Sequence, residues 1–591
     1  MKKYPTLTVI PTRREVVQVF GGYNHNLRIP EGEFYDMENL TSDYYPTLSP
    51  RSKRYLYKNI RAGGLIEKDS LCYVLNDIEN GCAYFYINEH KVEGFTLSYD
   101  PQKPIKRLIS IGSYVVIMPD KKYINTVNID DKGSIDNIFE APSNSAIKYT
   151  PCTVTGADID VLAQPQEPAD HSKYWLDTST TPNALKKYNT VDEKWITVAT
   201  TYIKIEGAGI ADGFSVGDGI TLENSIVESI NGLNIILAKG NSESTGKSYI
   251  VITGLTDSAT QQGQLVISRK MPQMDYIVEC GNRLWGCFFG YDMETNETRN
   301  IIYASKLGDF KNWNVNQTVS TDSYYAEVGT DGQFTGAITH RGYPLFFKEN
   351  YIHKVYGNYP SNFQIQATAC RGVQRGCDRS LAIVNETLFY KSKSGICAFD
   401  GSMPQEVSSN LGTVQYGDAV AGAVGYKYYV SMRDSEGRYS TFVLDTQKGL
   451  WHREDHLHAA EFCSTDSRLY FIDVDKDYAI WTTSKTENEC ENDIKWYAIT
   501  GPIQADTPDK KYISRLTLRL SMKRGSKMRV YIEYDSSDEW EHLYNIDGDR
   551  LQSCPIPVIP KRCDHLRLKF EGVGESKLFS ICKVIEEGSD E

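Results

Sequence analysis

The feature that most limits the fold of this chain is a β unit that recurs roughly every 40 residues. Each unit has an apolar strand, a polar turn, a second strand often rich in Tyr or Phe, another turn and a third strand. Residues 107–129, RLISIGSYVVIMPDKKYINTVNI, show this layout. Such a meander cannot bury its own faces, whereas units stacked radially bury them and leave only short edges. We therefore expect an all-β fold with a six- or seven-bladed β-propeller, and a generic β-sandwich is the alternative.

The composition also favours β-structure. The 40 Tyr residues and the 12% aromatic content suit pleated, half-buried strands, and helical periodicity is nearly absent. At 591 residues the chain exceeds the usual size of one core, so about two to four domains are expected.

Two changes of composition divide the chain. Residues 141–269 are rich in Thr, Ser, Ala, Gly and Asp, which indicates one or more small β domains inserted on a surface loop. After a polar, acidic linker, residues 495–591 alternate apolar and polar residues in long strands, which predicts a C-terminal β-sandwich. The propeller then covers residues 55–140 and 270–490, and residues 1–54 form an N-terminal strap that enters it.

Charge and cysteine usage exclude several classes of protein. The net charge of −13 argues against a general DNA-binding or membrane-binding surface. The 13 cysteines include no CxxC pair, which suggests free thiols in a reducing cytoplasm. Neither a signal peptide nor a membrane-spanning segment is expected, because the N-terminus has no continuous apolar core and no apolar run is long enough.

Two glycine-rich stretches resemble nucleotide-binding loops only in part. Gly240 to Ser248, GNSESTGKS, has five residues between its glycines where a phosphate-binding loop needs four, and no long helix pattern follows. Gly207 to Gly213, GAGIADG, has neither the GxGxxG spacing nor a βαβ setting. Both stretches are interpreted as turns, and no cofactor is expected.

Two groups of polar residues could in principle bind a metal. His452, His456 and His458 lie near Glu454 and Asp455, a donor set that suits zinc or iron. On a strand, His456 and His458 share a face, and His452 joins them only if there is no bulge, so a polar strand edge is favoured. No metal site is expected here.

A second acidic group, Asp473, Asp475 and Asp477, lacks the Gly and Glu that a calcium loop of the EF-hand type requires. A hairpin turn with solvated carboxylates is favoured. Two acids that converge about 5 to 10 Å apart can also cleave glycosides, but a sequence does not show which acids converge. We therefore predict no catalytic residue and a chain that is not an enzyme.

Several strings, taken in order, resemble the packaged-DNA stabilisation or tail nozzle proteins of tailed phages and prophages, whose core is a β-propeller. In this chain, residues 301–303 would be a blade strand, Gly308-Asp309 a turn, and Trp313 a side chain packed between blades. The strings are DYIVECGNRLWG (275–286), YASKLGDFKNWN (303–314), GYNHNLRIPEGEFYDMENLTSDYYPTLSPR (22–51), FFKENYIHKVYGNYPSNFQI (346–365), GVQRGCDRSLAIVNETLFYKSKSGICAFDGSMP (372–404) and GLWHRED (449–455).

The resemblance implies a structural virion protein, made in the bacterial host cytoplasm and located in the tail or at the head–tail junction. There it would form part of the tail nozzle or head-to-tail conduit, which extends the portal channel and retains or guides packaged DNA. About six copies would form a ring that contacts portal, adaptor and other tail proteins. Packaged DNA would pass through the channel without sequence-specific binding, and acidic walls would repel its phosphates.

The alternative is a peripheral receptor-binding (adhesin) or glycan-processing protein. Aromatic side chains on propeller loops could stack on sugars, and the C-terminal sandwich could be a lectin-like module. The conduit predicts ring stoichiometry, whereas the alternative predicts measurable affinity for glycans.

Overall fold

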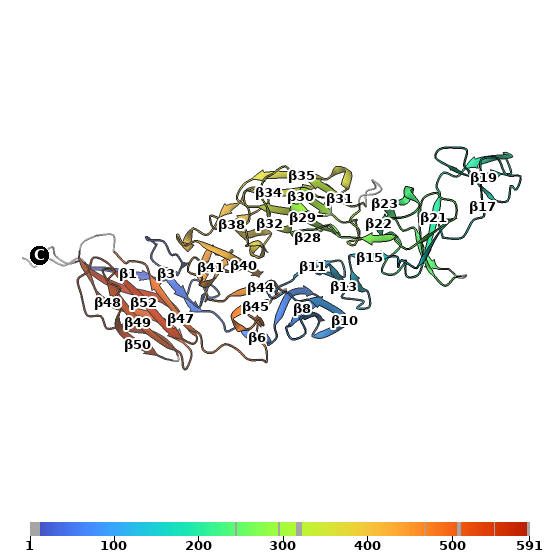
Figure 1. Cartoon of the computed structure of the whole chain (residues 1–591). Helices are drawn as coiled ribbons and strands as arrows, with labels where there is room; N and C mark the ends of the chain where they lie inside the picture. The colour runs from blue at the N-terminus through green and yellow to red at the C-terminus, as the bar shows by residue number, and fades with distance from the viewer. Residues whose placement is uncertain are drawn as a thin grey trace, which may run out of the picture.

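The computed structural model describes residues 12–242, 245–293, 296–314, 322–465, 467–504, 510–548 and 550–587. The chain is built from strands, and the helices in these ranges are five 3₁₀ turns: η1 (Glu228–Ile230), η2 (Pro360–Asn362), η3 (Asp378–Ser380), η4 (Ser409–Leu411) and η5 (Val474–Lys476). Three parts follow one another along an elongated molecule, with a β-sandwich at one end, a propeller in the middle and the inserted domain at the other end (Figure 1).

Seven four-stranded antiparallel sheets form the blades of the propeller. Blades 1 to 3 are β7 (Ala62–Lys68), β8 (Ser70–Asp77), β9 (Cys82–Ile87) and β10 (His90–Ser98); β11 (Arg107–Ile111), β12 (Tyr114–Met118), β13 (Lys122–Asn125) and β14 (Lys132–Ser134); and β28 (Tyr276–Cys280), β29 (Arg283–Asp292), β30 (Glu297–Ala304) and β31 (Tyr324–Glu327). Blades 4 to 6 are β32 (Phe334–His340), β33 (Tyr343–Lys348), β34 (Tyr351–Tyr356) and β35 (Gln364–Ala369); β36 (Ala382–Val384), β37 (Thr387–Lys391), β38 (Ile396–Phe399) and β39 (Gln405–Glu406); and β40 (Tyr416–Val424), β41 (Lys427–Asp434), β42 (Tyr439–Asp445) and β43 (Leu450–Arg453).

Blade 7 closes the ring by joining distant parts of the chain. It combines β44 (Ala459–Ser464), β45 (Leu469–Asp473) and β46 (Ala479–Thr482) with β6 (Tyr55–Lys58), which pairs with β46 as the fourth strand. The first strands of the blades are neighbours around the ring, and β44 of blade 7 contacts β7 of blade 1. The expected all-β propeller is confirmed, with seven blades.

Apolar clusters between the blades hold the ring together. Trp313 lies between β30 and β31 of blade 3 and is buried with Ile109, Val116, Ile277 and Phe310, side chains that come from blades 2 and 3 and from the turn before Trp313. The expected packing of this Trp between blades is confirmed. Gly308 occupies the preceding turn with a φ of +71°, a conformation that favours glycine.

The insert is a two-sheet domain that carries a small third sheet. The two sheets enclose a core rich in Ile. Its strands are β15 (Asn137–Glu140), β27 (Val266–Arg269), β22 (Gly219–Glu223) and β23 (Gly232–Ile235) in one sheet; β24 (Ala238–Asn241), β25 (Ser248–Thr253), β21 (Tyr202–Gly207), β16 (Ala146–Cys152) and β26 (Ala259–Gln262) in the other; and β17 (Val161–Gln164), β18 (Tyr174–Asp177), β19 (Ala184–Asn189) and β20 (Lys194–Thr197) in the third. Because β15 pairs with β27, the insert begins before residue 141.

The C-terminal part is a sandwich of two sheets that also takes strands from the N-terminus. One sheet has the order β1 (Thr12–Val17), β53 (Ser576–Glu587), β48 (Lys511–Met522) and β51 (Leu551–Ile556). The other has the order β2 (Gly22–Tyr23), β3 (Glu33–Glu38), β47 (Lys495–Thr500), β52 (Leu566–Val573), β49 (Lys527–Tyr534) and β50 (Glu541–Asp547). The prediction that residues 1–54 are only a strap was therefore wrong for β1 to β3. The strap proper is residues 40–54, with the short strands β4 (Leu40–Thr41) and β5 (Ser49–Pro50).

All 13 cysteines are free thiols, as expected. Within the described ranges, no helix has the length and apolar character that crossing a membrane requires.

Candidate functional site

Among the described residues, the histidines singled out in the sequence do not form a ligand set with the acids beside them. His452 is buried, and burial lowers its pKa to about 3. The ring of His458 stacks on Tyr439 at 3.7 Å between centroids, whereas Nδ1 of His456 lies 2.8 Å from the Tyr439 carbonyl oxygen. Asp455 forms an ion pair with Arg54 instead of facing the imidazoles. In the part of the chain that the structure describes, no group of His, Cys, Asp and Glu could hold a metal ion.

The other candidate motifs are turns. Asp473 caps η5 by accepting a hydrogen bond from the backbone N–H of Asp475, and Asp477 forms an ion pair with Arg61. Residues 207–213 follow β21 with two glycines at positive φ. Residues 240–248 connect the antiparallel strands β24 and β25, with residues 243 and 244 outside the described ranges.

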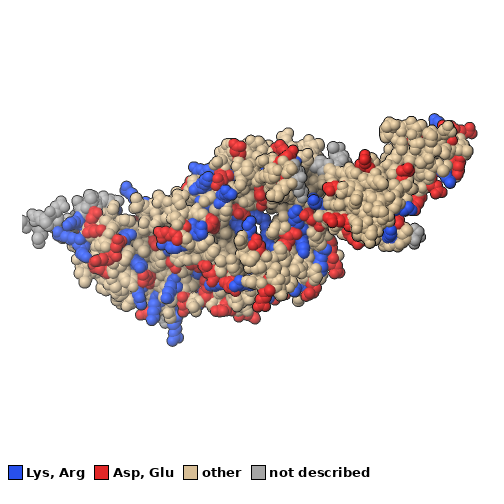
Figure 2. All heavy atoms as spheres, in the orientation of Figure 1, with Lys and Arg blue, Asp and Glu red and all other residues tan. Residues whose placement is uncertain are grey.

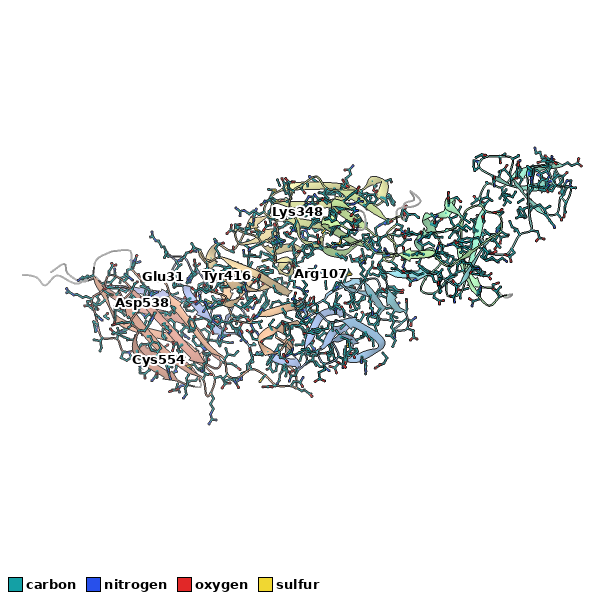
Figure 3. All side chains as sticks on the ribbon, viewed as in Figure 1. Glu31, Arg107, Lys348, Tyr416, Asp538 and Cys554 are labelled. Atoms are coloured by element: carbon teal, nitrogen blue, oxygen red, sulfur yellow. The ribbon has the colours of Figure 1, made fainter. Side chains whose placement is uncertain are left out.

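A different group of charged residues meets at the centre of the propeller. Arg107 begins β11 of blade 2, Asp378 and Arg379 lie in η3 before blade 5, and Glu461 lies on β44 of blade 7. The ion pairs among them join the segment before blade 5 to blades 2 and 7. These blades are not neighbours in the ring, so their side chains can touch only near the axis of the propeller. Figure 3 places Arg107 in the middle of the ring. Figure 2 shows a hollow there with Lys and Arg atoms on its walls.

Glu461 receives two hydrogen bonds in this group. A bulge in β44 between Ala459 and Glu461 sets the orientation of its side chain. Oε2 accepts a bond from the backbone N–H of Leu65 in blade 1 at 2.7 Å, and Oε1 accepts one from Nη1 of Arg379 at 2.6 Å. Burial raises the pKa of Glu461, and the nearby guanidinium of Arg379 offsets this rise only in part.

Asp378 is the second carboxylate of the group. It forms an ion pair with Arg107, whose guanidinium lies 5.7 Å from the ring centroid of Tyr276. Burial, followed by the charge of Asp378, raises the pKa of the Tyr276 hydroxyl. Nη2 of Arg379 also donates to the carbonyl of Lys106, 3.3 Å away. The two carboxylates and two guanidinium groups thus form one network.

The network remains partly open to solvent. The exposed fraction of the four side chains runs from 15% for Glu461 to 28% for Arg107. A carboxyl group whose pKa is raised can serve as a proton donor, and a second carboxylate can accept a proton from water or attack a reacting carbon. Cleavage of a glycosidic bond uses these two roles, a proton donor on one side and a base or nucleophile on the other. The same contacts also fasten blades 1, 2, 5 and 7 to one another.

Sequence reasoning missed these residues because none of them belongs to a motif. Arg107 and Glu461 stand 354 positions apart in short apolar strands, and only ring closure brings them together. The available signal was the string CDRS (377–380), in which an acidic and a basic residue stand directly before the apolar residues that begin blade 5.

Comparison with known proteins gave no match to a family model and no match among curated proteins. Solved structures that resemble the chain include an exo-β-1,3-galactanase from Phanerochaete chrysosporium, with 10% identity, coverage of 76% of this chain and 100% of that chain, and a TM-score of 0.19. An engineered GH43 glycoside hydrolase with endo-xylanase and exo-arabinofuranosidase activity has 10% identity, coverage of 52% and 97%, and a TM-score of 0.20. A puromycin hydrolase has 11% identity, coverage of 70% and 58%, and a TM-score of 0.24. At these TM-scores the similarity carries no argument about activity.

The expectation of a phage tail nozzle protein, and of a chain that is not an enzyme, is contradicted by these findings. No family model and no curated relative supports a phage family, and the three solved structures above carry enzyme names, which their TM-scores do not extend to this chain. The sequence strings suggested the phage family because they contain residues that stabilise a propeller. Trp313 and the turn before it pack two blades together, and many unrelated propellers require such packing. The six-copy ring, the portal and adaptor partners and the virion location depended on that resemblance, and nothing here tests them.

Proposed function

We propose that this chain processes glycans by cleaving a glycosidic bond at the centre of the propeller. The observation that carries the proposal is Glu461, a mostly buried carboxyl group with a raised pKa that shares one polar network with a second carboxylate, Asp378. The partly exposed network leaves the two acids within reach of a substrate. The hollow at the axis is the kind of concave surface that small ligands occupy.

In the proposed reaction Glu461 is the general acid. It gives its proton to the glycosidic oxygen as the bond to the anomeric carbon breaks, and the leaving sugar departs as an alcohol. Asp378 acts on the opposite side of the sugar, where it either accepts a proton from the attacking water or attacks the anomeric carbon itself. Arg107 and Arg379 hold the two carboxyl groups in place.

The test is hydrolysis of a panel of oligosaccharides, measured as new reducing ends, with Glu461→Gln and Asp378→Asn. Removing a general acid or its partner typically costs about 10²- to 10⁴-fold in rate, and we expect a loss in this range for each variant. Asp477→Asn, at the exposed Arg61 pair, is the control and should keep full activity.

The pH profile adds a second readout. Because Glu461 must be protonated to act and its pKa is raised, activity should persist above the ordinary range of a glutamate and fall as pH rises through the shifted pKa. Absence of hydrolysis across the panel, or full activity in folded Glu461→Gln protein, would contradict the proposal.

A further inference from the structure

A second cavity lies between the strap and the sandwich, away from the propeller centre. It has a volume of about 710 Å³. Its walls are strap residues 44–55, the turn between β48 and β49, and the turn between β52 and β53. We call it the seam cavity. Its volume falls in the range of small-molecule binding sites, about 300 to 1,000 Å³, and exceeds what a single small ion needs.

The seam cavity is positively charged in an acidic protein. Five cationic side chains line it against two carboxylates, whereas the whole chain has a net charge of −13. The two carboxylates are already engaged, since Asp493 pairs with Lys53 and Glu575 pairs with Lys523, each at 2.8 Å. A positive pocket on an acidic molecule attracts anions selectively.

Two of the cations have no carboxylate partner. Within the described residues, neither Arg524 nor Lys577 forms an ion pair, and Nζ of Lys577 lies 3.4 Å from the ring centroid of Tyr44. Arg524 stands in the β48–β49 turn and Lys577 near the start of β53, so they approach the cavity from two hairpins of the sandwich. These two side chains are available to an anionic ligand.

Hydroxyl groups complete the lining. Ser49 is 2% exposed, and its Oγ makes no hydrogen bond to any described residue. Ser526 and Ser576, also buried, line the same cavity. The Oγ of Ser49 has almost no accessible surface, so this side chain forms part of the cavity wall and does not contact a ligand.

We propose that the seam cavity binds an acidic saccharide unit, one that bears a carboxylate or a sulfate. Arg524 and Lys577 would contact the anionic group, and Tyr44 would offer an aromatic edge. The choice of a saccharide rests on the proposed function, because a glycan cleaved at the propeller centre could extend to a second binding site. The positive charge of the cavity is independent of that function.

The experiment is isothermal titration of the full chain carrying Glu461→Gln, which prevents turnover. The probes are a uronic acid trisaccharide, a sulfated trisaccharide, a neutral trisaccharide and inorganic phosphate. We expect at least one acidic trisaccharide to bind about 10-fold or more tightly than the neutral one, and the two acidic probes distinguish carboxylate from sulfate. Arg524→Gln and Lys577→Gln should each weaken that binding about 10-fold, as expected for a lost charge-assisted contact.

Arg433→Gln is the matched control, since Arg433 is an exposed arginine on blade 6 paired with Asp418. It should leave the affinity unchanged. Equal affinity for neutral and acidic probes, binding of phosphate as tight as binding of the trisaccharide, or equal weakening by Arg433→Gln would overturn the proposal. If acidic saccharides bind but the native chain hydrolyses no oligosaccharide, the seam site stands and the proposed function fails. If the native chain hydrolyses oligosaccharides but no acidic saccharide binds the seam cavity, the proposed function stands and the seam site fails.

Discussion

At the scale of single residues, Arg54 is the position outside the proposed site where we expect a substitution to reduce stability most. It is buried and forms ion pairs with Glu454 and Asp455, each at 2.6 Å, while the neighbouring Arg51 binds Glu491 at 2.7 Å. The cluster joins the strap to the segment after blade 6 and to the linker before the sandwich. Burial alone would raise the pKa of Asp455, but the charges of Arg54 and Arg51 outweigh it and lower that pKa.

We predict that Arg54→Met lowers the free energy of unfolding by about 3 kcal/mol, because it removes the nearest cation from the buried Glu454 and the partly buried Asp455. These carboxylates then keep only their longer contacts to Arg51, at 3.9 and 3.3 Å. Because the pKa of Asp455 is lowered in the folded chain, its stabilising contribution is present above the ordinary aspartate pKa and is lost as the pH falls toward the folded value. Urea unfolding at pH 7, and at a pH below the ordinary aspartate pKa of about 3.9, measures both effects. Arg433→Met, at an exposed pair, should change stability by less than about 1 kcal/mol, and an equal loss there would refute the cluster's role.

At the scale of elements, β6 is the strand that closes the ring. Leu56 stands opposite Trp481 of β46, and its backbone N–H donates to the carbonyl of Glu489 at 2.8 Å. A proline at this position lacks the N–H and disturbs the strand. We predict that Leu56→Pro speeds amide hydrogen exchange in β46 of blade 7 at least about 10-fold more than in β34 of blade 4.

Leu56→Ala is the matched control for this prediction, since it shortens the side chain and keeps the N–H. It should change exchange in β46 much less. Unchanged exchange in β46 of the proline variant would mean that the ring holds without its closing strand.

The difference between local and distant pairing also decides what the sequence could predict at this scale. Blades such as β11 to β14 are meanders of neighbouring strands, so alternation and turn residues at short range were enough to predict them. The closure by β6 and the pairing of β1 with β53 join residues more than 400 positions apart, and no local pattern records such pairing. The contacts of Asp378 with Arg107 and of Glu461 with Leu65 were missed for the same reason, because they also join blades that lie far apart in the sequence.

At the scale of the whole molecule, the insert leaves the propeller through two adjacent strands. Asn137 of β15 stands directly opposite Arg269 of β27, so the chain enters and leaves the insert at one point. Opposed residues in an antiparallel pair lie about 5 Å apart at their Cα atoms, a gap that a short linker can span. The insert also encloses a core of its own. Both features are expected of a domain whose folding does not depend on the ring.

We predict that replacing residues 137–269 with a four-residue Gly-Ser linker yields a folded propeller and sandwich whose midpoint of thermal unfolding stays within about 5 °C of the native value. Hydrolysis that depends on Glu461 should persist, because the charged network at the axis contains no residue of the insert. Deletion of residues 427–445, which removes β41 and β42 of blade 6, is the contrasting variant and should prevent folding, because it breaks the ring. Aggregation of the first variant, or loss of its hydrolysis while it stays folded, would show that the insert belongs to the core or the active site.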